Sequence, residues 1–153
     1  MAFGRRSIRL MQTSFNLDSA DATLLIQGAI ARSNEIDVPQ NIAVVDSAGH
    51  LLAFHRMDGA KFISIEIAIA KAFTASGARK ATAEIGPATQ PGQPGFGIQN
   101  LQAGRFTTLP GGIPVVIDGE VAGAIGVSSG TTAQDADVAE HAIRSFTAMR
   151  TAA

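Results

Sequence analysis

The chain has 153 residues, which is enough for one domain with a hydrophobic core and too few for two domains of ordinary size. Hydrophobic residues make up 46% of it and charged residues only 16%, and the net charge is −1, so no basic surface for nucleic acid or for an anionic membrane is expected. The chain has no cysteine, which excludes disulfides, thiolate catalysis and cysteine-bound metals.

The low share of charged residues predicts that subunit contacts cover part of the surface, and hence a homo-oligomer. No apolar run is long enough to cross a bilayer. The pair Arg5 and Arg6 is not followed by the apolar stretch that an export signal needs. We therefore expect a cytoplasmic protein, with a flexible N-terminal arm over residues 1–14 and a single domain over residues 15–153.

The first predicted elements are a helix and a hairpin. Residues 17–34 have apolar side chains at helical spacing, and Asp18 can cap the start of this helix. Residues 41–46 are apolar and β-branched, which predicts a strand. A turn over residues 46–49 then leads into a second strand over residues 50–57, so the two strands form a hairpin.

A second helix and a long loop follow. Residues 62–76 are predicted to form a helix that is apolar on nearly all sides and therefore buried on more than one side. The isoleucines that alternate over residues 63–69 also fit a strand, but the alanine-rich continuation favours a helix. Residues 86–97 are rich in glycine and proline and have no periodicity, which predicts a long loop, followed by a short helical turn over residues 98–103.

The next stretch predicts a second hairpin. Asp118 and Gly119 stand between two apolar runs, and both residues tolerate the positive φ of a tight turn. Gly123 and Gly126 lie inside the second of these runs. Because glycine weakens the interior of a strand, they predict a close approach by another backbone, a helix or a ligand.

A final helix is predicted over residues 133–150, with Thr132 and Asp135 as a capping box. The order is then helix, hairpin, helix, long loop, hairpin and helix. Hairpins that alternate with helices predict an α+β fold with a mainly antiparallel sheet. We expect about five strands, flanked by the helices.

Three stretches, in this order, resemble the GlcG/HbpS-like family: VVDSAGHLLAFHRMDGA, AIAKAFTA and GGIPVVIDGEVAGAIGVSSGTTAQDADVA. The resemblance covers roughly residues 15–150 and implies a profilin-like fold that assembles into dimers or larger oligomers, including octamers. Relatives include haem-binding proteins, some described as haem-degrading, and the C-terminal domain associated with some corrinoid adenosyltransferases. Many others are encoded among catabolic enzymes, so the resemblance implies fold more directly than function.

The resemblance and the helix start together indicate a ligand site. The backbone N–H groups of residues 128–132 precede a helix, a position that suits an anionic group. Some haem-binding relatives use a histidine in the first helix, and this chain has none between Leu17 and Asn34. The predicted ligand-binding residues are Arg56, Lys71, Gly111, Gly112, Pro114, Ser128, Ser129, Gly130 and Thr131.

Five polar side chains carry the candidate chemistry. Lys71 would bind a carboxylate, such as a haem propionate or an acid substrate, or act as a base if desolvated; alternatively it extends its ammonium to the surface. Asp58, His55 and Glu66 are candidate proton-transfer groups beside Arg56. Each also has a structural interpretation: Asp58 as a helix cap or ion-pair partner, and the others as surface residues. His55 is the candidate metal ligand, because imidazole commonly ligates haem iron.

We therefore predict a haem- or tetrapyrrole-binding protein, accessory to a catabolic pathway, with haem as its cofactor. One alternative is a small cofactor-independent enzyme that acts on an organic acid, with Arg56 and Lys71 holding the anion. A second alternative is a non-catalytic oligomeric accessory protein. The sequence leaves open whether the protein catalyses a reaction.

Overall fold

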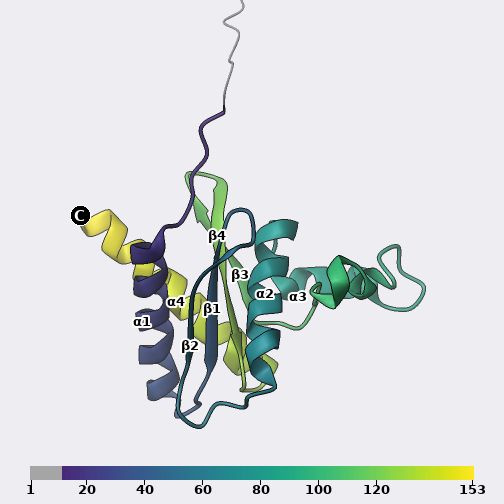
Figure 1. Cartoon of the computed structure of the whole chain (residues 1–153), viewed down its shortest axis with the longest axis horizontal. Helices are drawn as coiled ribbons and strands as arrows, with labels where there is room; N and C mark the ends of the chain where they lie inside the picture. Colours follow the sequence, from purple (N-terminus) through teal and green to yellow (C-terminus); the bar gives the residue numbers. More distant parts are fainter. Residues whose placement is uncertain (1–11) are drawn as a thin grey trace, which may run out of the picture.

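The computed structural model describes residues 12–153, which form one four-stranded sheet with helices on both faces (Figure 1). The strand order is β2-β1-β4-β3, and each neighbouring pair is antiparallel. The predicted α+β class is confirmed, but the prediction of about five strands is wrong. The described residues contain four strands, which are those of the two predicted hairpins. The predicted arm over residues 1–14 lies mostly outside the described residues.

Two hairpins lie side by side in the sheet. Their strands are β1 (Asn41–Asp46) with β2 (Leu51–Arg56), and β3 (Gly112–Ile117) with β4 (Glu120–Ser128). Asp118 and Gly119 join β3 to β4 with φ values of 48° and 80°, so the predicted Asp-Gly turn is confirmed. Since β1 pairs with β4 at the centre, β2 and β3 are the edges of the sheet.

The helices divide between the two faces of the sheet. They are α1 (Ser19–Glu35), α2 (Ser64–Ala78), α3 (Thr82–Ile85) and α4 (Thr132–Ala152). Helices α1 and α4 pack together over one face, where Ile42 and Val44 of β1 point. Helix α2 covers the other face, where Ala43 and Val45 point. The alternation along β1 thus separates a core of large side chains from a second core rich in alanine, which lets α2 approach the sheet closely.

The sequence predicts the N-terminal cap of α1 correctly but not that of α4. Asp18 caps α1 as expected, and its Oδ1 accepts a hydrogen bond from Asp21 N at 2.9 Å. The predicted capping box of Thr132 and Asp135 is wrong. The capping residue is Thr131, whose Oγ1 accepts from Gln134 N at 3.2 Å, while Gln134 Oε1 accepts from Thr131 N at 2.9 Å.

This assignment of the cap predicts different effects for two neighbouring threonines. Replacing Thr131 with alanine is expected to lower the free energy of unfolding by about 1 kcal/mol, because the N–H of Gln134 loses its acceptor. Thr132→Ala is the matched control and is expected to change stability by less than about 0.5 kcal/mol. Urea denaturation of both variants measures the difference, and equal losses would contradict the assignment.

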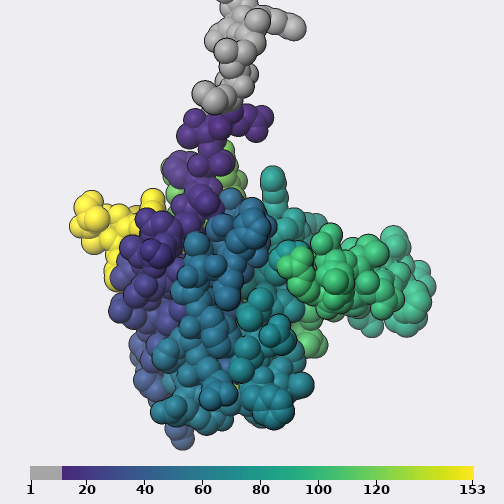
Figure 2. All heavy atoms as spheres, in the orientation of Figure 1, coloured from purple at the N-terminus to yellow at the C-terminus, as the bar shows by residue number. Residues whose placement is uncertain are grey.

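The segment between α2 and β3 projects from the rest of the molecule (Figures 1 and 2). The predicted loop over residues 86–97 begins with a 3₁₀ helix at Gly86–Thr89, and the predicted helical turn is confirmed as two 3₁₀ helices, Ile98–Asn100 and Gln102–Gly104. Phe96 is 66% exposed here. Across residues 12–153, no helix has the length and apolar character needed to cross a membrane.

Candidate functional site

A stripe of side chains along α2 stays partly open to solvent. Phe62, in the turn before α2, is followed by Glu66, Ile69 and Phe73 at intervals of four, three and four residues, which places them on one side of the helix. The sheet contacts another side of α2, through Ala68, Ala72 and Ala75. The open stripe borders the edge strand β2, at Leu51, and the segment that leads into β3, at residues 106–109.

Three hollows open along this stripe, and we call them together the α2 groove. The first, of about 220 Å³, lies between Leu51 on β2 and Glu66 and Phe73 on α2. The second, of about 300 Å³, adjoins Phe73 and Phe106. The third, of about 450 Å³, adjoins Glu66 and Phe106. Because neighbouring hollows share residues, they form an interrupted groove in the size range of small-molecule sites.

Arg105 lines the first hollow and lies over Phe73 of α2. Its guanidinium carbon lies 4.1 Å from the centroid of the Phe73 ring, which is a cation–π contact. Among residues 12–153 no carboxylate forms an ion pair with this side chain. The first hollow is therefore lined by apolar side chains, by His50 and Glu66, and by the positive charge of Arg105.

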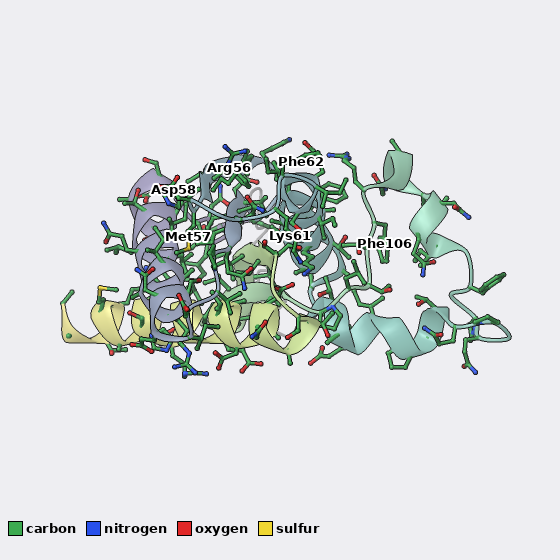
Figure 3. The ribbon with its side chains drawn as sticks, turned by 90° about the horizontal axis from the view of Figure 1, so that it is seen from below. Arg56, Met57, Asp58, Lys61, Phe62 and Phe106 are labelled. Atoms are coloured by element: carbon green, nitrogen blue, oxygen red, sulfur yellow. The ribbon has the colours of Figure 1, made fainter. Side chains whose placement is uncertain are left out.

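Further charged residues lie near the start of α2. Figure 3 views the molecule from below and shows Arg56 between Asp58, on the side of α1, and Phe62, just before α2, with Phe106 nearer the projecting segment. Arg56 and Asp58 are both exposed, as is Phe62, at 76%. The structure thus brings two of the predicted site residues, Arg56 and Asp58, to the surface, and neither borders the α2 groove.

The loop between β2 and α2 is held against the end of the sheet. Asn41 Nδ2 donates to the carbonyl oxygen of Lys61 at 2.8 Å, and Lys61 N donates to Ser129 Oγ at 2.9 Å. Ser129 has a φ of 139°, a conformation that is strained for residues other than glycine. This predicted ligand-binding residue therefore positions the loop that carries Lys61.

Lys71 lies in the interior, although it was predicted to face a ligand. Its side chain is buried, at 1% exposure, and Nζ donates to Val127 O and to Asp135 Oδ2, both at 2.8 Å. Asp135 Oδ1 in turn accepts from Gly130 N at 2.9 Å. Desolvation lowers the pKa of Lys71, and the Asp135 carboxylate opposes that shift. The buried pair joins α2, β4 and the start of α4.

Several predicted ligand-binding residues surround this buried pair. Gly111 and Gly112 are buried and leave room for the Lys71 ammonium and for the backbone of α2. Ser128 is also buried, at the end of β4, and Pro114 is half-buried on the edge strand β3. Their role toward a ligand stays a prediction, because none of them borders the α2 groove.

The N–H groups at the start of α4 already have acceptors within the protein. Gly130 N donates to Asp135 Oδ1 at 2.9 Å and to Gln40 Oε1 at 3.2 Å, while Thr131 N donates to Gln134 Oε1 at 2.9 Å. Binding of an anion by Gly130 and Thr131 stays a prediction, and it would require these bonds to be exchanged.

The three histidines lie on different elements. His55 is exposed on β2 and pairs with Ile42, which places it on the α1 side of the sheet, away from Lys71 and the α2 groove. His50 borders the first hollow, and its Nδ1 is 3.7 Å from Asp46 Oδ2. His141 lies on α4. In the described part of the chain, no three His, Asp or Glu side chains are grouped to hold a metal ion.

Two residues of this region were missed by the sequence analysis. Arg105 lies in a segment without periodicity, and no pattern in the sequence marks it. The sequence predicts Asp135 as part of a helix cap and of the helix start that resembles the family, but not as the partner of Lys71. A signal for its role exists, because Lys71 is the one charged residue in the alanine-rich half of a helix predicted to be buried, and a buried ammonium needs an acidic partner.

Comparison with known proteins gives a match over most of the chain. Residues 17–144 match the model of a family described as "Haem degrading protein HbpS-like". A Citrobacter freundii protein, described as an uncharacterized 15.0 kDa protein in the dhaT-dhaS intergenic region, is 42% identical over 127 residues. This match covers 83% of the chain and 89% of that relative.

Solved structures give a consistent result. The crystal structure of Klebsiella pneumoniae protein ORFY is similar with a TM-score of 0.90 and 35% identity, over 92% of this chain and 97% of that one. The crystal structure of a complex of PduOC with haem is similar with a TM-score of 0.82 and 33% identity, over 85% of this chain and 94% of that one. The similarity therefore extends over nearly the whole fold.

Proposed function

Because the chain belongs to the HbpS-like family, we propose that it binds haem or a related tetrapyrrole in the α2 groove. The membership agrees with the GlcG/HbpS-like resemblance of the sequence, which is confirmed. Support for the ligand comes from PduOC, which forms a complex with haem and is 33% identical to this chain. Support for the location comes from the α2 groove itself.

The observation that carries this location is an apolar hollow with a histidine at its edge. Leu51, Ile69 and Phe73 line the first hollow, and they offer apolar contact to a flat macrocycle. His50 borders the same hollow, and imidazole is a common axial ligand of haem iron. These residues offer an iron ligand and apolar contacts, and because the first hollow has only about 220 Å³, a macrocycle would extend from it along the α2 groove. Haem, when bound, supplies a redox-active iron, while the residues of the chain hold and orient it.

Titration of the purified protein with hemin tests the proposal. A saturable Soret shift is expected for the wild type, and His50→Ala is expected to weaken binding by about tenfold or more, because one ligand of the iron is lost. His141→Ala is the matched control and is expected to bind like the wild type.

The same experiment distinguishes the two histidines that could ligate the iron. His55 is the metal ligand that the sequence analysis predicts, and it lies on the other face of β2. A loss of binding in His55→Ala but not in His50→Ala would move the site to the α1 side of the sheet. A well-folded wild type that gives no saturable shift would overturn haem binding altogether.

Exposed apolar side chains support a homo-oligomer as well. Within residues 12–153, four large apolar residues are at least 60% exposed: Phe62, Ile63, Phe96 and Leu101. Such surface in a folded protein is typical of subunit contacts. The family resemblance suggests two further parts of the proposal. One is assembly of between two and eight copies, and the other is an accessory role in a catabolic pathway.

The alternative of an organic-acid enzyme has less support. Its anion-binding lysine, Lys71, is buried against Asp135 and borders none of the three hollows. Proton transfer by Lys71, Asp58, His55 or Glu66 therefore stays a prediction. For Lys71 to take part, its ammonium would have to leave the Asp135 carboxylate before it meets a substrate.

A further inference from the structure

We propose that Arg105 binds a carboxylate of the ligand in the α2 groove, so that the groove selects flat, apolar molecules that carry an acid group. The inference rests on the proposed function and deepens it, because it names the chemical class of the ligand. It depends on the position of Arg105, on its lack of an acidic partner and on the way its backbone is held.

The guanidinium of Arg105 is oriented but not paired. It lies 4.1 Å above the ring of Phe73, and its one hydrogen bond within the described residues is a long one, from Nε to Gln102 O at 3.4 Å. By contrast, Arg32 pairs with Glu35 at 2.9 Å and with Asp137 at 2.7 Å. A guanidinium is planar, and stacking on an aromatic ring fixes the orientation of that plane, so that its N–H groups are placed to bind a carboxylate.

A buried threonine holds the backbone at Arg105. Thr74 follows Phe73 on α2 and is 2% exposed. Its Oγ1 donates to Arg105 O at 3.3 Å and accepts from Thr107 N at 3.0 Å. The stack with Phe73 and these two bonds tie Arg105 to α2 at two points. Arg105 is therefore placed in advance of binding, which reduces the entropy lost when a ligand is held.

The charges around the first hollow favour one orientation of an acid ligand. Glu66 and Arg105 both line it, without forming an ion pair. A carboxylate on the ligand would be repelled by Glu66 and attracted by Arg105. The apolar part of the ligand would then lie against Leu51 and Ile69, and its acid group would meet Arg105 where the guanidinium stacks on Phe73.

Esterification of the ligand tests this inference. Hemin and its dimethyl ester are titrated from the same dilute detergent into the full chain, and Soret absorbance gives both dissociation constants. The wild type is expected to bind the free acid about 10- to 100-fold more tightly, as a charge-assisted hydrogen-bonded pair would provide. Arg105→Ala is expected to lose most of this preference, and Arg105→Lys to retain part of it, because an ammonium keeps the charge but not the planar donor pair.

Arg150→Ala is the matched control. Arg150 also lies over a phenylalanine, 5.8 Å from the Phe146 ring, but on α4, away from the groove. It is expected to keep the preference of the wild type. Equal binding of acid and ester by the wild type, or an unchanged preference in a folded Arg105→Ala variant, would overturn the role of Arg105 and leave haem binding intact. Failure of the wild type to bind either compound would overturn the proposed function and this inference with it.

Discussion

Replacing Lys71 with methionine is expected to lower the free energy of unfolding by about 3–5 kcal/mol. The substitution leaves the carboxyl group of Asp135, at 3% exposure, without the ammonium that now lies 2.8 Å from it. Since small domains are stable by only about 5–15 kcal/mol, this change removes a large part of the total. Denaturation by urea, followed by circular dichroism, measures it.

A second variant shows whether the loss comes from the unpaired charge. Combining Lys71→Met with Asp135→Asn removes both charges and leaves an amide that can still accept from Gly130 N, so we expect it to recover more than half of the loss. Arg144→Met removes an exposed cation 3.8 Å from Glu140 and is expected to have a much smaller effect. A loss below about 1 kcal/mol for Lys71→Met would contradict the account of the buried pair.

Replacing Gly126 with alanine is expected to lower the free energy of unfolding by about 3 kcal/mol or more. Gly126 on β4 and Gly112 on β3 are directly opposite one another, and α2 crosses both. A Cβ at position 126 would clash with the carbonyl oxygen of Ala68 and lie 2.5 Å from Ala72 N. Both are backbone atoms of the helix, so no side-chain rotation relieves the clash, and α2 must move away from the sheet.

Gly77→Ala is the matched control for this prediction. Gly77 lies near the end of α2, and a Cβ there would meet no atom within 4 Å. Alanine is therefore expected to raise the free energy of unfolding by about 0.5–1 kcal/mol, since it restricts the unfolded chain and favours the helix. Thermal melts of both variants compare the two effects. Equal stability of Gly126→Ala and the wild type would show that the glycine is not needed for close packing.

Local signals were sufficient for most of the fold. The Asp118-Gly119 turn and the cap at Asp18 depend on neighbouring residues, and both are confirmed. The close approach predicted at Gly126 is also confirmed, with α2 as the approaching element. The cap of α4 was misplaced by one residue, because two adjacent threonines offer the same hydroxyl and only the folded backbone selects Thr131.

The candidate site was harder to predict, because its groups meet across long stretches of sequence. Lys71 and Asp135 are 64 residues apart, and no local pattern pairs them. Arg105 reaches Phe73 from a segment that has no periodicity, so its stacking follows from tertiary packing alone. The alternation of β2 placed His55 and Arg56 on opposite faces. The same pattern does not indicate which face of β2 borders a groove, since that depends on where α2 packs.

The most direct test of a haem site in the α2 groove is paramagnetic broadening of backbone amide resonances by ferric hemin. The signals of Leu51, Ile69, Phe73 and Arg105 are expected to broaden first on titration, since these residues line the first hollow. Signals from α1 and from the outer side of α4 should persist. Broadening that centres on His55 and α1, or that spreads evenly over the chain, would contradict the account.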